Sequence, residues 1–269
     1  MDEEAWGPAR EGGRTTEQGR ARSGAGAGAA LPDSVRLALW FTAWCEGCAS
    51  LDEARDRVVG GDAAHDVVGL PGTDGTVPLI LALGLLRSER ATGAGPAMPE
   101  PGDPLGLGGP PAFNAEAMEV GEAVVLRGVG LGLVPMRAGA GVVWRCLPAN
   151  DRRQVPDLAE ADTALRATLP QIADELAALD VARWRPEVAD ELMALRRPQE
   201  LDVPDGMLPR AQRMLALAIR CRTIVDLALV DDGGALTAAE AERRRQALLP
   251  LDRAARRALV AACSQPFGR

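Results

Sequence analysis

The chain has 269 residues, of which 47% are hydrophobic and 25% are charged, a balance typical of a globular protein. All 30 basic residues are arginine, and His65 is the only histidine. These absences exclude lysine-dependent phosphate loops, kinases and Schiff-base enzymes, together with zinc sites built from several histidines. Carboxylate chemistry, cysteine chemistry and arginine-based anion binding remain open.

The net charge of −8 is unevenly distributed along the chain. Residues 235–269 carry seven arginines against Glu240, Glu242 and Asp252, a net charge of +4. Residues 1–31 carry −1, so the remaining residues 32–234 carry −11. A field of that sign opposes nucleic acid as the main partner, because nucleic acid binding relies on neutralising phosphates.

The hydropathy of the sequence predicts no membrane-spanning segment. No apolar run approaches the roughly 18–20 residues that span a bilayer. The first residues include Asp2, Glu3 and Glu4 and no apolar core of a signal peptide follows them. We therefore expect a cytoplasmic protein that has no membrane association.

The first half of the chain is expected to mix helices with a few strands. Residues 1–31, which end in alternating glycine and alanine, predict a disordered tail. Helices are expected from Pro32-Asp33-Ser34, from the capping box Ser50-Leu-Asp-Glu53, and over 77–90, with a short strand near 65–70. Residues 91–118, rich in proline and glycine, predict a long loop anchored by apolar side chains.

The second half is expected to begin with strands and end in helices. Segments 123–126, 130–136 and 142–147 have the composition of strands, and Ala138-Gly-Ala-Gly141 predicts a hairpin between the last two. From Asp157 onward the apolar spacing is helical, with 207–230 as the most apolar helix and Pro250 separating two short final helices.

Together these elements predict an α+β fold that is mostly α, a helical bundle with a small two- or three-stranded antiparallel β-ribbon. The domains are expected to be a disordered tail over 1–31, an α/β N-terminal part over 32–150 that contains the 91–118 loop, and a helical C-terminal part over 151–269. The last two can share one core.

The first candidate site is the thiol pair Cys45 and Cys48. The segment Trp44-Cys45-Glu46-Gly47-Cys48 resembles the active-site motif of thioredoxin-like oxidoreductases, which implies thiol-redox chemistry at a helix N-terminus. Here the capping residues place the motif at the end of a helix, where the helix dipole disfavours a thiolate. We therefore interpret the pair as structural, with redox chemistry as the alternative. His65, close to a loop, is interpreted as a polar surface residue.

Two further regions are candidate binding surfaces. The turn-rich loop around Asp103-Pro104 is the preferred one, since binding residues often lie on such loops; the alternative is an ordered crossover whose aspartate caps a turn. Its candidate residues are Asp103, Leu105, Leu107, Phe113 and Asn114. The second region is a basic patch that could contact nucleic acid, an acidic partner or the acidic body of the protein itself. Its members are Arg243, Arg244, Arg245, Arg253, Arg256 and Arg257.

One broader resemblance runs from about Leu31 to the C-terminus. In phrases such as Pro101-Gly-Asp-Pro-Leu-Gly-Leu107 and Leu251-Asp-Arg-Ala-Ala-Arg-Arg-Ala-Leu259, the chain resembles uncharacterised hypothetical proteins of high-GC actinobacteria. This resemblance implies no function, and we predict no cofactor and no metal. The leading hypothesis is a non-enzymatic interaction or regulatory protein that contacts an unknown protein partner through the 91–118 loop and the ribbon. The alternatives are an enzyme of unrecognised type, using carboxylates or Cys45 and Cys48, and a nucleic-acid accessory protein using the arginine patch.

Overall fold

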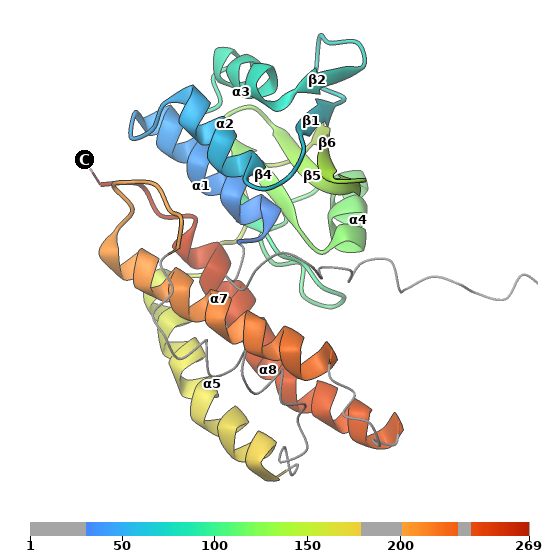
Figure 1. Ribbon diagram of the computed structural model, residues 1–269, viewed down its shortest axis with the longest axis vertical. Coiled ribbons are helices and arrows are strands. Elements are labelled where there is room, and N and C mark those ends of the chain that lie inside the picture. Colours follow the sequence, from blue (N-terminus) through green and yellow to red (C-terminus); the bar gives the residue numbers. More distant parts are fainter. Residues whose placement is uncertain (1–30, 179–200, 231–237, 269) are drawn as a thin grey trace, which may run out of the picture.

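A six-stranded mixed sheet organises the N-terminal half of the chain (Figure 1). The computed structural model describes residues 31–178, 201–230 and 238–268. The strand order is β2-β1-β6-β5-β4-β3, and β1 pairs parallel with β6 while all other pairs are antiparallel. The strand bounds are β1 His65–Val68, β2 Thr76–Pro78, β3 Gly93–Ala97, β4 Ala123–Arg127, β5 Leu131–Ala138 and β6 Gly141–Pro148.

The predicted fold class is therefore wrong. The sequence predicts a helical bundle with a two- or three-stranded antiparallel ribbon. The structure instead has a six-stranded sheet, in which β4, β5 and β6 of the predicted ribbon are neighbouring strands. The predicted strands correspond to β4, β5 and β6, but β2 and β3 were missed and β1 was not assigned to the same sheet. β3 has the sequence Gly93-Ala-Gly-Pro-Ala97, which has low strand propensity. It is extended because β4 pairs with all five of its residues.

Helices cover both faces of this sheet. α1 (Asp33–Glu46) packs across β3 and β4, and α2 (Leu51–Val59) and α3 (Leu79–Ser88) lie beside it on the same face. α4 (Pro111–Val120) covers the other face, where the Phe113 ring packs against Gly132; a Cβ at Gly132 would lie 2.5 Å from that ring. The segment expected to be a loop over 91–118 therefore contains β3 and most of α4.

The C-terminal half is an assembly of helices that shares core residues with the first half (Figure 1). Its described helices are α5 (Leu158–Ala178), α7 (Pro209–Val230) and α8 (Ala238–Ala262). Val35 and Leu39 of α1 and Met98 pack into the same apolar cluster as these helices. α8 continues through Pro250, where two short helices were expected, because burial of Leu248 and Leu251 offsets the roughly 3 kcal/mol that an internal proline costs. None of the described helices is long and apolar enough to cross a membrane.

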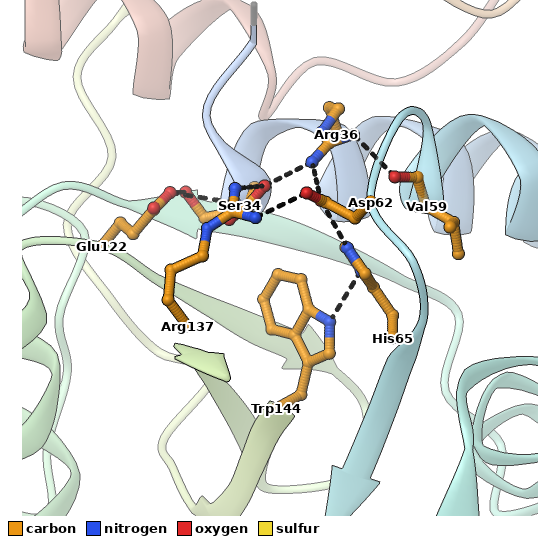
Figure 2. Close-up of polar contacts among 9 residues, drawn as sticks. Ser34, Arg36, Val59, Asp62, His65, Glu122, Arg137 and Trp144 are labelled. Atoms are coloured by element: carbon orange, nitrogen blue, oxygen red, sulfur yellow. Dashed lines mark hydrogen bonds and ion pairs between the residues drawn. The ribbon is translucent and has the colours of Figure 1, made fainter. Parts of the chain in front are cut away.

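A partly buried polar network fixes the start of α1 against the sheet (Figure 2). Asp62 accepts hydrogen bonds from Arg36 (3.1 Å), Arg137 (2.6 Å) and His65 (2.9 Å). Asp33 also pairs with Arg36 and with Arg137, and Glu122 accepts from both the backbone and the hydroxyl of Ser34. The network therefore joins α1, the segment before β1, and β5.

His65 is buried within this network, so its interpretation as a surface residue is wrong. The Trp144 indole can only donate, so His65 Nδ1 accepts that bond (3.2 Å) and Nε2 carries the proton that binds Asp62. Burial lowers the pKa of His65 and keeps the ring neutral. Burial by itself would raise the pKa of Asp62, but hydrogen bonds from His65, Arg137 and Arg36 outweigh it and lower that pKa to about 2.

Replacing Asp62 tests this network. Because its folded pKa lies below its ordinary value of 3.8, the carboxylate stabilises the fold above that pH, and this contribution is lost as pH falls towards 2. We expect Asp62→Asn to lower the free energy of unfolding at neutral pH by on the order of 2 kcal/mol, and the difference from wild type to shrink below about pH 4. Urea unfolding followed across pH measures both effects. Asp56→Asn, at a carboxylate that is 61% exposed, is the control; a pH-independent difference for Asp62→Asn would contradict the assignment.

Candidate functional site

The predicted binding loop is packed into the fold. Asp103, Leu105, Leu107 and Phe113 are all buried, and the Asn114 side chain accepts a hydrogen bond from the backbone of Gly109 (3.0 Å). These candidate residues pack against other parts of the same chain, and the exposed surface of the loop comes instead from Pro101, Gly102 and Pro104.

Half of the predicted basic patch contacts this same loop. Arg256 is buried and donates to the Met98 carbonyl (2.8 Å), to Glu100 (3.0 Å) and to Asp252 (2.8 Å). Arg257 lies 3.4 Å from one Asp103 oxygen, while Arg256 and Arg253 lie 3.5 and 4.0 Å from the other. The two candidate surfaces therefore meet in one ion-pair cluster, which joins the loop to α8; Arg256 and Asp103 are buried in it, and Arg253 and Arg257 are exposed.

The other half of the patch lies at the beginning of α8. Arg243 and Arg245 are exposed there, and Arg245 pairs with Glu242 at 2.7 Å. The side chain of Arg244 lies outside the described residues. The structure thus brings Arg253, Arg256 and Arg257 together with Asp103, and leaves Arg243 and Arg245 apart from them.

The Cys45–Cys48 segment ends α1, as the capping residues predicted. α1 runs to Glu46, and Gly47 adopts a left-handed conformation in which its amide bonds back to the helix. Both cysteines are free thiols. Burial raises the pKa of Cys45 to about 11, although the Arg87 and Arg127 charges act against this effect. The Cys45 thiol is therefore protonated at neutral pH, which is the opposite of an activated nucleophile.

An open cleft of about 630 Å³ lies beside Cys45. Its volume is within the range of small-molecule sites. The walls come from the end of α1, the end of α3, the connection between α3 and β3, the end of β4 and the C-terminal segment that follows α8. The lining residues are Cys45, Glu46, Arg87, Arg90, Ala91, Thr92, Arg127 and Phe267.

The arginines of this cleft have no carboxylate partner among the described residues. Arg87 lies 4.4 Å from the centre of the Trp44 ring and donates to the Trp44 carbonyl (3.2 Å). Arg127 Nη2 binds the Thr42 hydroxyl (3.3 Å), while its Nε is buried without a hydrogen-bond partner. The single carboxylate in the lining, that of Glu46, accepts from the Phe267 amide (3.1 Å).

Glycines in β3 make room for two guanidinium groups side by side. A Cβ at Gly93 would lie 2.5 Å from Arg127 Nη2, and one at Gly95 would lie 1.8 Å from Arg153 Nη2. Positions 93 and 95 point to the same face of the strand, so both arginines cross that face. Within the described part of the chain Arg153 binds only neutral groups, the Pro96 carbonyl (2.7 Å), the Gly106 carbonyl (3.3 Å) and the Ser264 hydroxyl (3.4 Å). Burial together with the Arg127 charge lowers its pKa to about 10.

Sequence reasoning missed this cleft, except for Cys45. The available signal was Gly93-x-Gly95, since glycines two apart in a strand often mark close approach of another group. The proline and glycine content of residues 91–118 predicts a loop, and the spacing of two between glycines indicates close approach only within a strand. Arg87, Arg90 and Arg127 follow no recognisable motif, because the tertiary fold alone brings β4 beside the end of α3. Among the described residues, no three His, Cys, Asp or Glu side chains are placed to hold a metal ion.

The ion-pair cluster around Arg256 yields a stability prediction. Arg256→Ala removes the buried cation that Asp252 and Glu100 share, and breaking a buried pair costs about 3–5 kcal/mol. Because Glu100 is 40% exposed and Arg222 remains 3.7 Å from Asp252, we expect a loss at the lower end of that range. Arg253→Ala, three residues away on α8 and 63% exposed, should cost less than about 0.5 kcal/mol. Denaturant unfolding of both variants measures the difference. Equal losses would mean that the cluster does not hold the loop to α8.

Comparison with known proteins places the chain in a family. Two family models match it, the N-terminal domain of Rv1486c-like proteins over residues 34–160 and the C-terminal domain of the same proteins over residues 159–260. The chain is 29% identical to the uncharacterized protein Rv1486c of Mycobacterium tuberculosis, over 85% of this chain and 95% of that protein. It is 35% identical to the uncharacterized protein MAV321 of Mycobacterium avium, over 38% of this chain and 41% of that protein.

No solved structure matches the chain significantly. The matched relatives are themselves described as uncharacterised, so they bring no activity, ligand or partner with them. The two domain matches together extend over most of the chain. The chain therefore belongs to the Rv1486c-like family of actinobacterial proteins, to which no function is attached.

Proposed function

We propose that this protein is a non-enzymatic, ligand-responsive regulatory protein that binds a small molecule in the cleft beside Cys45. One observation carries the proposal: the cleft is walled by the sheet-containing half on one side and by the C-terminal segment after α8 on the other. A ligand that fills such a cleft contacts both halves and so alters how firmly they are held together.

The contacts of the C-terminal segment support this coupling. The Phe267 amide binds Glu46 at the end of α1, and the Gly268 amide binds the Gly206 carbonyl (2.8 Å). Ser264 accepts from Arg153, which itself bonds to the end of β3. The segment thus links α8, the segment before α7 and the sheet, next to the cleft.

The state of the two reactive side chains favours binding over catalysis. Cys45 lines the cleft, but its raised pKa leaves little thiolate at neutral pH. His65 is not among the lining residues, and its ring nitrogens are engaged by Trp144 and Asp62. Burial of Arg256 and of Asp103, Leu105, Leu107 and Phe113 also supports a cleft ligand over a partner bound at either of those surfaces. We further propose a cytoplasmic location, which the five free thiols support.

Hydrogen exchange can test this function. The full-length protein is incubated with the small-molecule fraction of a mycobacterial extract, and bound species are identified by native mass spectrometry. We expect a ligand that slows amide exchange both near Ala91–Thr92 and in the segment around Phe267, because it bridges the two walls.

Phe267→Ala removes the aromatic wall contributed by the C-terminal segment and should weaken binding about tenfold. Leu249→Ala, at an exposed position of α8, is the matched control and should bind like wild type. Protection confined to the sheet half, or unchanged affinity of Phe267→Ala, would show that the ligand does not couple the two halves.

A further inference from the structure

The charge of the cleft points to the chemistry of its ligand. Three guanidinium groups line it against one carboxylate, and that carboxylate already accepts the Phe267 amide. The chain has 38 acidic residues for 30 arginines, so an excess of cations is not forced by composition. Elsewhere most described surface arginines are paired, as Arg57 is with Asp202 (2.6 Å) and Arg145 with Glu116 (3.2 Å).

Arg127 is held in the cleft wall by a neutral contact. Its Nη2 binds the Thr42 hydroxyl (3.3 Å), and among the described residues its guanidinium pairs with no carboxylate. Burial and the nearby Arg127 charge lower the pKa of Arg153, and among the described residues Arg153 pairs with no carboxylate. These two neighbouring cations add to the positive potential beside the cleft, which an anion would relieve.

Arg90 supplies a third guanidinium to the cleft, next to the exposed Thr92. It has φ +75° where α3 ends, and the Ala91 amide bonds back to the Leu86 carbonyl across this turn. Glycine adopts this conformation without strain, whereas it costs an arginine about 1 kcal/mol.

We propose that the cleft binds the phosphate group of a small molecule as a dianion, with Arg90 and Arg127 as its main charged donors. This inference rests on the proposed function and names the chemical class of the ligand. Guanidinium groups bind phosphate oxygens through paired N–H donors, and the net excess of two positive charges in the lining matches a phosphate monoester. Thr92 adds a neutral hydroxyl, and Phe267 provides an apolar wall for the remainder of the molecule.

Phenyl phosphate is a suitable probe, because a monoester with a second pKa of about 6 is a dianion at about pH 8 and its ring can contact Phe267. Calorimetric titration of the full-length protein at constant ionic strength should show saturable binding. Malonate, a dicarboxylate of the same charge, and chloride at equal ionic strength should both bind more weakly.

Arg90→Gly separates binding from folding. Glycine relieves the positive φ, so we expect the variant to melt at the same temperature as wild type or higher, yet to bind phenyl phosphate about tenfold more weakly. Arg127→Gln should weaken binding at least as much. Arg166→Gln removes the same charge from α5, outside the cleft and 61% exposed, and should leave affinity unchanged.

Three results would overturn the phosphate assignment: binding no stronger than that of chloride, malonate binding tighter than phenyl phosphate, or equal losses in Arg90→Gly and Arg166→Gln. Each of these leaves the proposed function standing if the extract still yields a ligand that protects both walls. Conversely, phosphate binding that leaves exchange in the C-terminal segment unchanged would confirm the ligand class and overturn the regulatory role.

Discussion

The hydrogen bonds and ion pairs of the buried Arg256 guanidinium hold the two halves of this protein together. The guanidinium binds the Met98 carbonyl, Glu100 and Asp252, and so fastens the segment after β3 to α8. Burial and the neighbouring charge of Asp252 raise the pKa of Glu100, which shows how strongly the two carboxylates depend on the cation they share. Because α8 leads directly into the segment that contains Phe267, this same contact determines where one wall of the cleft lies.

Two ion-pair clusters, around Asp62 and around Arg256, differ from the cleft in how their charge is balanced. Around Asp62 and around Arg256, cations and anions alternate and most donors are used, so these clusters stabilise the fold. In the cleft, Arg87, Arg90 and Arg127 have only neutral protein partners or none among the described residues. Placing unpaired cations in a concave, partly buried site costs folding free energy, and a bound anion offsets that cost.

Several elements were predictable because their signals are local. Ser50 accepts the Glu53 amide at the start of α2, and Gly47 ends α1, as their spacing indicated. The β5–β6 hairpin followed from two apolar runs and the turn between them. The rest of the sheet was missed because β1 pairs with β6 across a long stretch of chain and β3 is built of glycine, alanine and proline. The candidate site was missed for the same reason, apart from Cys45, since its arginines lie on segments that only the sheet brings together.

The sequence by itself determined the absence of lysine chemistry, the ends of the early helices, the central hairpin and the reading of Cys45–Cys48 as the end of a helix. Each of these depends on residue identity or on contacts within a few positions of the chain. The tertiary structure alone decided that His65 is buried, that Asp103 faces the arginines of α8, and that Arg87, Arg90 and Arg127 share a cleft. These features depend on strand pairing and helix packing between distant segments. Whether a charged side chain is stabilised depends on its desolvation cost and on the partners it meets, and both are fixed only where those segments pack together.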